Sequence, residues 1–133
     1  MKAVSGTDES GRPRHGAYSE TFKNGRAACK GEFERGLKTG VWTYFLVNGS
    51  VKAEGSYRND IIVGDWRWFR ENGALMQTGS FSNDGEKQGR WCRYYPDGAL
   101  MDEGEFDRGL KVGVWTTYDE SGKVKKTKCF RSP

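Results

Sequence analysis

The sequence has few of the residues from which catalytic sites, metal sites and disulfide frameworks are built. It contains one histidine, three cysteines and three prolines in 133 residues. Histidine-based catalysis would depend on His15 alone, and a lone terminal histidine is most simply a solvated side chain. Three widely separated cysteines form neither a disulfide framework nor a zinc-binding spacing. The sequence therefore predicts a protein that is not an enzyme, with no metal or cofactor, in a reducing cytoplasm.

Long apolar runs are also missing. The first fifteen residues, MKAVSGTDESGRPRH, lack the apolar core of a signal peptide or membrane anchor. No later stretch approaches the length of a membrane-spanning helix. The net charge of +4 is mild, so it permits an acidic partner without requiring one. We expect residues 1–15 to form a flexible N-terminal tail.

Glycine, in contrast, is abundant, and its spacing indicates an internal repeat. The chain has 19 glycines. One set recurs at intervals of 24, 24, 25 and 24 residues, namely Gly16, Gly40, Gly64, Gly89 and Gly113. A second glycine follows nine positions later, and a third follows fifteen positions later except in the last copy, where Lys128 stands instead. A fixed period of this kind predicts a repeat architecture, which explains the glycine content without a phosphate-binding loop.

Each copy has the pattern of a β-hairpin. The second glycine follows Asn24, Asn48, Asn72, Asp97 or Ser121. Asn-Gly and Asp-Gly favour a two-residue type I′ turn, in which both residues have positive φ. This turn would place Tyr18, Trp42, Trp66, Trp91 and Trp115 opposite Gly31, Gly55, Gly79, Gly104 and Lys128, in that order. We expect each indole to cover the backbone that its cross-strand glycine leaves bare.

Because side chains alternate along a strand, this register also assigns the two faces of the sheet. The tryptophan face would carry the aliphatic set Ala27, Val51, Leu75, Leu100 and Val124 and the aromatic set Phe33, Tyr57, Phe81, Phe106 and Phe130. A second aromatic set, Phe45, Phe69, Tyr94 and Tyr118, falls on the opposite face unless a bulge redirects it. The fold class predicted is all-β, a single-layer antiparallel β-meander built from tandem hairpins of about 24 residues. It would occupy residues 16–133, with five hairpins that start near residues 16, 40, 64, 89 and 113.

The pattern G-x-W-x-x-(F/Y)-x-x-(N/D)-G, followed by G-x-(F/Y)-x-x-G-x-x-x-G, resembles the MORN repeat. It is most similar to the bacterial variant found in YwqK-type proteins. The best matches are GEFERGLKTGVWTYF and GEFDRGLKVGVWTTY, and the resemblance covers residues 16–130. It implies a long twisted single-layer sheet and a non-enzymatic role in binding another protein. YwqK-type proteins are commonly classed as antitoxins or immunity-type proteins, so the resemblance implies a toxin or scaffold partner; some eukaryotic members bind membrane phospholipids.

Differences between the copies indicate a candidate binding surface, because a frame must repeat whereas a specific surface need not. The two central hairpins carry arginines interleaved with aromatic residues: Arg67, Trp68, Phe69, Arg70, Arg93, Tyr94 and Tyr95. Such residues are enriched in protein-binding hot spots, and they also suit a nucleic-acid strand. The alternative is that they only shield a thin sheet from water. We interpret the seven as a candidate partner-binding set.

Positive charge gathers in the C-terminal segment GKVKKTKCFRSP, at Lys123, Lys125, Lys126, Lys128 and Arg131. One interpretation is a weak contact with anionic lipid or nucleic acid. The other is edge protection, because lysines on the last strand of an open sheet discourage edge-to-edge growth. Two open ends and apolar faces favour self-association. Carboxylates such as Asp102, which the register places opposite Arg93, are expected to form weak exposed pairs rather than a catalytic site.

Overall fold

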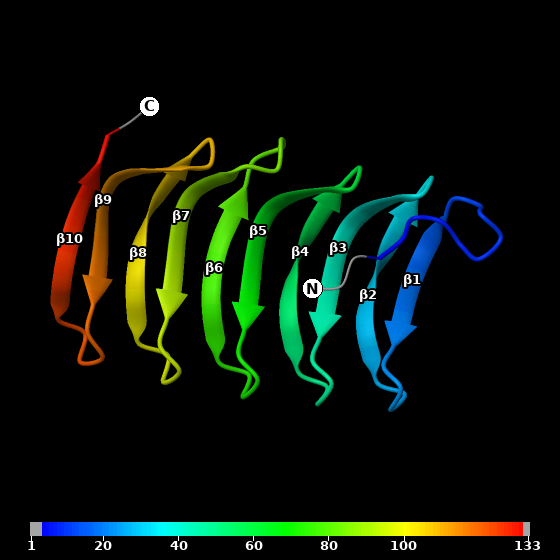
Figure 1. Ribbon diagram of the computed structural model, residues 1–133, viewed down its shortest axis with the longest axis horizontal. Helices are drawn as coiled ribbons and strands as arrows, with labels where there is room; N and C mark the ends of the chain where they lie inside the picture. Colours follow the sequence, from blue (N-terminus) through cyan, green and yellow to red (C-terminus); the bar gives the residue numbers. More distant parts are fainter. Residues whose placement is uncertain (1–3, 132–133) are drawn as a thin grey trace.

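The computed structural model describes residues 4–131 and consists of one open antiparallel sheet (Figure 1). Its ten strands lie side by side in chain order. They are β1 Gly16–Thr21, β2 Ala27–Glu34, β3 Leu37–Phe45, β4 Val51–Arg58, β5 Ile61–Phe69, β6 Leu75–Phe81, β7 Lys87–Tyr94, β8 Leu100–Asp107, β9 Leu110–Tyr118 and β10 Val124–Phe130. Within residues 4–131 no helix is long and apolar enough to cross a membrane. The predicted all-β single-layer meander is confirmed.

The predicted pairing of the central hairpin residues is also confirmed. In every copy, the residue two positions after the first glycine lies opposite the residue fifteen positions after it. The observed pairs are Tyr18 with Gly31, Trp42 with Gly55, Trp66 with Gly79, Trp91 with Gly104 and Trp115 with Lys128. One register therefore holds in all five hairpins.

The indoles, however, do not cover the glycines with which they pair. Trp66 lies over Gly55 of the preceding hairpin, so close that a Cβ on Gly55 would be 2.1 Å from the ring. The same contact joins Trp42 to Gly31, Trp91 to Gly79 and Trp115 to Gly104. Trp66 also donates its Nε1 hydrogen to the Ser56 carbonyl of that preceding hairpin, at 3.2 Å. Each copy's glycine thus accommodates the indole of the next copy, and we call this the glycine–indole contact.

This contact explains why the two end copies depart from the repeat. The last copy has Lys128 in place of glycine, and β10 is the final strand, with no following indole strand beside it among residues 4–131. The first copy has Tyr18 in place of tryptophan, and in the described part of the chain β1 has no preceding hairpin to cover. Glycine is needed only where an indole follows, and tryptophan only where a glycine precedes.

The first glycine of each copy bends its strand. β3, β5, β7 and β9 run along one end of the sheet and then turn sharply (Figure 1). Gly40 within β3 has a φ of 68°, which glycine adopts without the steric cost that other residues incur. The bend adds residues to β3 relative to β2. Lys30 pairs with Thr43, and Glu32 pairs with Thr39, so a single β2 residue lies opposite three residues of β3. The extra length brings the following indole over the preceding strand.

The predicted type I′ turn at the Asn-Gly and Asp-Gly sites is wrong. In these loops only the glycine has a positive φ, and the loop is one residue longer. Leu46 closes it, because its carbonyl accepts from Gly49 N–H at 2.9 Å and its N–H donates to the Ser50 carbonyl at 2.8 Å. Asn48 instead accepts the Ser50 N–H with its side-chain oxygen at 2.9 Å, which is an Asx turn. The side chain rather than the backbone of Asn48 therefore makes the turn.

Two-residue turns with positive φ at both positions occur in the linkers between hairpins. Arg35 and Gly36 have φ of 51° and 83°, and the Asn59-Asp60 and Arg108-Gly109 linkers have the same geometry. The linker after β6 is longer, because Ser82 and Glu86 close a loop that ends at Gly85, with φ of 81°. This extra residue accounts for the single interval of 25 among the first glycines.

The longer hairpin loop shifts the pairing next to it, and this corrects one face assignment. Phe45 pairs with Val51, one residue out of the register that Tyr44 and Ala53 follow. The same shift joins Phe69 to Leu75, Tyr94 to Leu100 and Tyr118 to Val124. Residues that pair directly share a face. The aliphatic set therefore lies with the second aromatic set, opposite the tryptophan face, and the prediction that it shares the tryptophan face is wrong.

The core lies on the tryptophan face, toward the N-terminal half of the sheet. Trp42 and Trp66 are fully buried, and Cys29, Phe33, Tyr44 and Ala53 complete the buried cluster. Rings of neighbouring strands meet edge to face, as Tyr57 and Trp66 do at 5.3 Å between centroids. Trp115, at the other end, is only half-buried. Burial therefore declines along the sheet, and the C-terminal half of this face is open.

Residues 4–15 fold back on the N-terminal end of the sheet. Thr7 bridges Pro13, Arg14 N–H donates to the Gly6 carbonyl at 2.8 Å, and Gly36 N–H donates to the Arg14 carbonyl at 2.8 Å. Val4 packs against the buried cluster. The division into a flexible tail, residues 1–15, and a repeat domain stays a prediction, and residues 1–3 and 132–133 lie outside the described residues.

The buried phenol of Tyr44 predicts a loss of stability at alkaline pH. Burial raises its pKa, and its hydroxyl shares a 3.0 Å hydrogen bond with that of Tyr57. A phenol whose folded pKa exceeds its unfolded value of about 10 stabilises the fold fully below that pH and loses this contribution as the pH rises. Above about pH 10, the free energy of unfolding of the wild-type protein should fall with pH more steeply than that of Tyr44→Phe. The difference in slope should be up to about 1.4 kcal/mol per pH unit. Urea titrations on either side of that pH measure it, and identical slopes for both proteins would contradict it.

Candidate functional site

The seven predicted binding residues lie on three different surfaces. Trp68 and Arg93 lie on the tryptophan face, as their alternation with Trp66 and Trp91 requires. Arg67, Phe69 and Tyr94 lie on the opposite face, and Arg70 and Tyr95 lie in hairpin loops at the rim. The structure therefore brings Trp68 and Arg93 to one face and separates them from the other five.

On the opposite face, charged groups are used in cross-strand pairs. Arg67 forms an ion pair with Glu54 on the neighbouring strand, and its guanidinium carbon lies 5.7 Å from the Phe69 ring centroid. Glu103 accepts a hydrogen bond from the Tyr118 hydroxyl at 2.6 Å and pairs with Arg90. These two partners lower the pKa of the Glu103 carboxyl, with Tyr118 the larger cause. What this face offers a partner is mainly its rings and aliphatic side chains.

The two rim residues tie one hairpin loop to the next. Arg70 donates from Nη2 to the Tyr94 carbonyl at 2.9 Å, and the Tyr95 hydroxyl donates to the Tyr118 carbonyl at 2.7 Å. Asn24 makes the equivalent link in the first copy, from Nδ2 to the Val47 carbonyl at 3.1 Å. The polar groups of Arg70 and Tyr95 thus serve the architecture of the repeat.

Trp68 and Arg93 belong to a row of paired residues that crosses the whole sheet on the tryptophan face. From β1 to β10 the row reads Glu20, Cys29, Tyr44, Ala53, Trp68, Gln77, Arg93, Asp102, Thr117 and Lys126. Neither of its two positions carries the same residue type in any two of the five copies, although the glycines and indoles beside them repeat. We call this set the variable row. Sequence reasoning missed it, but the signal was available, because the positions four and thirteen residues after the first glycine differ in every copy.

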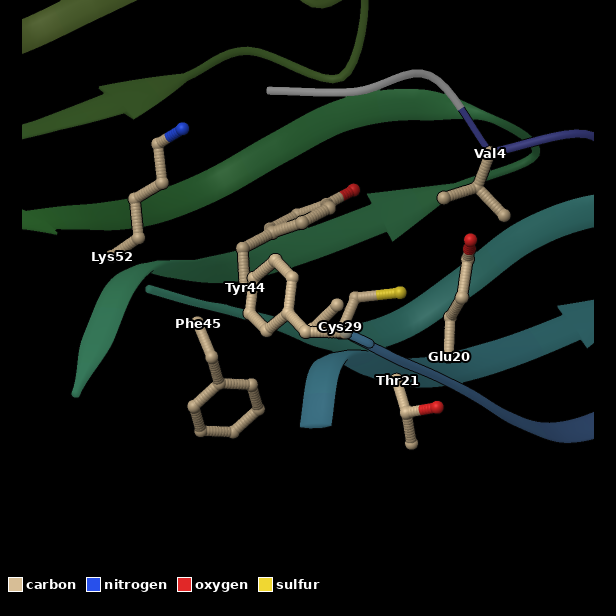
Figure 2. A pocket seen from close by; sticks show the side chains of 9 residues that line it. Val4, Glu20, Thr21, Cys29, Tyr44, Phe45 and Lys52 are labelled. Carbon is tan, nitrogen blue, oxygen red and sulfur yellow. The ribbon is translucent and has the colours of Figure 1, made fainter. Parts of the chain in front are cut away.

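The N-terminal part of the variable row is largely buried beside a small hollow. A cavity of about 250 Å³ is lined by Val4, Glu20, Cys29 and Tyr44, among others. In Figure 2, Glu20 and Tyr44 point toward the segment that carries Val4, while Phe45 points away. Burial raises the pKa of the Cys29 thiol, which disfavours the reactive thiolate. Within residues 4–131 no group of three metal-ligating side chains could hold an ion. The hollow therefore offers a recess with little chemistry of its own.

The C-terminal part of the variable row is open and charged. Two adjoining hollows of about 320 Å³ and 280 Å³ lie there, and both are lined by Arg93, Asp102, Lys111 and Trp115. Trp68, at the start of this open part, stacks on Trp66 with centroids 6.0 Å apart. This stretch, from Trp68 to Lys126, combines a half-exposed indole with charged side chains in a shallow depression.

The predicted pairing of Arg93 with Asp102 is confirmed, but the pair is not simply exposed. Arg93 donates from Nε to both carboxylate oxygens, at 3.0 and 3.1 Å, and from Nη2 to Oδ2. Asp102 is 8% exposed, and it is the one charged residue that is buried among residues 4–131. Its hydrogen bonds raise the pKa of Arg93. Removing Arg93 alone would leave a buried charge unpaired, which is strongly destabilising.

Comparison with known proteins agrees with the repeat seen in the structure. Residues 38–59, 62–83, 87–108 and 111–131 each match the model of the MORN repeat variant. The first match covers β3 and β4, and each later match likewise covers one strand with a glycine bend and its hairpin partner. No curated protein matches the sequence. Because the four matches account for more than half of its residues, the chain belongs to the MORN repeat variant family.

Proposed function

We propose that this chain is a non-enzymatic protein-binding module of the YwqK type that acts as an antitoxin or immunity-like protein in the cytoplasm. The observation that supports binding is the variable row. A regular frame repeats in every copy, while one line of side chains across it changes in every copy and becomes open from Trp68 onward. The antitoxin role rests on the resemblance to YwqK-type proteins, and its partner would be a protein toxin.

Within the variable row, Trp68 and Arg93 are the residues of the types that dominate protein-binding hot spots. They lie on adjacent hairpins with Gln77 paired to both. Arg93 keeps N–H donors that Asp102 does not use, because only its Nε and Nη2 contact the carboxylate. A partner that lies along this row would therefore contact the Trp68 ring and could offer hydrogen-bond acceptors to the unused N–H groups of Arg93.

The test replaces Trp68, Arg93 and Asp102 with alanine together, so that no buried carboxylate is left without its partner. As bait in lysate of the source organism, the wild-type protein is expected to retain a partner that the triple variant loses. Truncation of one hot-spot residue commonly weakens binding by about 2 kcal/mol or more, so the loss should exceed about thirtyfold. Titration of the purified partner measures it. Co-expression should then neutralise a toxic partner with the wild-type chain only.

A matched control lies on the opposite face of the sheet, on the adjacent strands β4 and β5. Phe69→Ala, Arg67→Ala and Glu54→Ala together remove one ring and one cross-strand ion pair, as the first variant does. This control is expected to keep the partner. Equal retention by both triple variants would remove the variable row from the binding surface, and absence of any wild-type partner would contradict the proposed function.

The alternative function, contact with anionic lipid or nucleic acid through the C-terminal lysines, is less well supported. Lys126 and Lys128 pair with Thr117 and Trp115 and share their face, whereas Lys125 lies at a register shift. Lys123 lies in the preceding loop. The lysines are thus divided among surfaces instead of forming one continuous patch. Binding to vesicles or oligonucleotides that falls steeply with added salt would favour this alternative.

A further inference from the structure

Cationic side chains line the open end of the tryptophan face. The two adjoining hollows are lined by Lys87, Arg93, Lys111, Lys126 and Lys128 and by a single carboxylate, Asp102. Five positive charges and one negative charge give +4, which equals the formal net charge of the whole chain. Within the depression, cations therefore outnumber carboxylates five to one. Clefts lined by one sign of charge attract partners of the opposite sign.

Two of these lysines are held in place by aromatic rings. The Lys87 ammonium lies 4.8 Å from the Trp91 ring centroid and 5.0 Å from that of Phe106. Lys111 repeats the arrangement, 4.6 Å from Trp115. Within residues 4–131 neither ammonium forms an ion pair with a carboxylate. The ring contacts therefore favour one position for each exposed ammonium, and both stay available to a ligand.

We infer that this depression binds carboxylates of an acidic segment of the protein partner, an inference that rests on the proposed function. Lys87 and Lys111 lie two strands apart and Lys128 lies one strand further. Neighbouring strands are about 4.8 Å apart, so the three ammonium groups span about 15 Å across the sheet. An extended acidic segment covers that span with about five residues, whose alternate side chains would face the lysines. The variable row supplies Thr117 and the free donors of Arg93 alongside them.

The geometry favours a protein segment over the other anionic partners. Single-stranded nucleic acid needs exposed rings on which its bases stack. Here Trp91 and Trp115 each have a glycine, Gly79 or Gly104, against the ring. Each also has a lysine ammonium, of Lys87 or Lys111, over the ring, so neither offers a free stacking surface. Lipid headgroups are met by lysines that project from a surface, whereas these lie down over rings inside a hollow. The side-chain carboxylates of an extended peptide can reach these lysine ammonium groups one at a time.

The test measures binding of a fluorescein-labelled octaglutamate peptide by fluorescence anisotropy at low salt. Lys87→Gln with Lys111→Gln is expected to weaken binding about tenfold, because it removes the two fixed cations. Lys23→Gln with Lys30→Gln makes the same change in net charge outside the depression and should weaken binding less than about twofold. Lys87→Arg with Lys111→Arg, which keeps both charges, should retain binding and shows that the affinity depends on the charges. An unchanged urea transition of the glutamine pair shows that its lost affinity is not lost folding.

Equal losses in both glutamine pairs would overturn the inference, because binding would then follow net charge alone. It would also be overturned if oligodeoxythymidylate of the same charge, or phosphatidylserine vesicles, bound as tightly as the peptide and lost binding with the same substitutions. The captured partner separates the two proposals. If Lys87→Gln with Lys111→Gln retains that partner at full affinity, the acidic-segment inference fails while the proposed function stands. If the wild-type chain captures no partner, the proposed function fails.

Discussion

Gly55→Ala is expected to destabilise the protein by about 3 kcal/mol or more, the upper end of overpacking costs. The added Cβ would lie 2.1 Å from the Trp66 ring, and neither the strand backbone nor a fully buried indole can move aside freely. The effect is large because the side chain enters the closest contact between neighbouring hairpins. Urea denaturation of the two proteins measures the difference.

Two controls show whether the cost comes from the glycine–indole contact. Lys128 occupies the repeat position of Gly55 in the last hairpin, where the described sheet has no indole from a following hairpin. Lys128→Ala should therefore alter the free energy of unfolding by less than about 0.5 kcal/mol. Adding Trp66→Leu to Gly55→Ala should recover part of the loss, because the smaller side chain leaves room for the methyl group. Adding Trp42→Leu, at the residue that pairs with Gly55, should recover nothing. Rescue by Trp42→Leu instead would show that the indole covers its own hairpin.

Trp66→Ala is expected to cost about 3–5 kcal/mol, as removal of a buried aromatic side chain usually does. Trp66 is fully buried, packs edge to face on Tyr57 and stacks on Trp68. Its Nε1 hydrogen bond to the Ser56 carbonyl would be lost as well. A cooperative urea transition at much lower denaturant, or failure to fold, would be the observed result.

Trp115→Ala provides the matched comparison at the C-terminal end. Trp115 occupies the same repeat position and also lies on a glycine, Gly104, but it is only half-buried. Its removal should therefore cost less, about 1–2 kcal/mol, because less apolar area is lost from the core. Equal costs for both substitutions would contradict a core that is concentrated in the N-terminal half.

The sequence was sufficient to predict the pairing of the hairpins but not the contact between them. Spacing along one chain identifies which residues face each other across a hairpin, and Trp66 does pair with Gly79. Which way a large ring leans depends on the bend at the first glycine, and no hairpin considered by itself contains that information. The end copies held the missing signal, since Tyr18 and Lys128 depart from the pattern where a neighbour is absent.

The turn prediction failed for a local physical reason. An Asn-Gly pair satisfies either a two-residue turn with both φ positive or a longer loop in which only glycine is left-handed. At Asn48 the side-chain oxygen accepts the Ser50 N–H, which stabilises the longer loop and leaves the asparagine φ negative. The added residue then moves Val51 to the other face of the sheet. One wrong turn type thus produced one wrong face.

Residue types alone indicated seven candidate binding residues, and only the two that the register places together on the tryptophan face remain in the proposed binding surface. Arg70 and Tyr95 have the residue types of a hot spot, but their donors are used between neighbouring loops. Trp68 and Arg93 have the same types and lie on one face of adjacent hairpins. Residue type alone does not distinguish a tie within the fold from a free binding group, so the proposal of a binding surface rests on the variation at these paired positions.

The end residues also limit how separate molecules can join. If β1 of one molecule extended the sheet at β10 of another, a phenol would meet the Lys128 side chain where every internal junction has an indole on bare backbone. Such a junction would lack the best-packed contact of the fold and would add a charged stem in its place. Joining β10 to a second copy of β1 would therefore be less favourable than the packing between neighbouring hairpins inside the sheet.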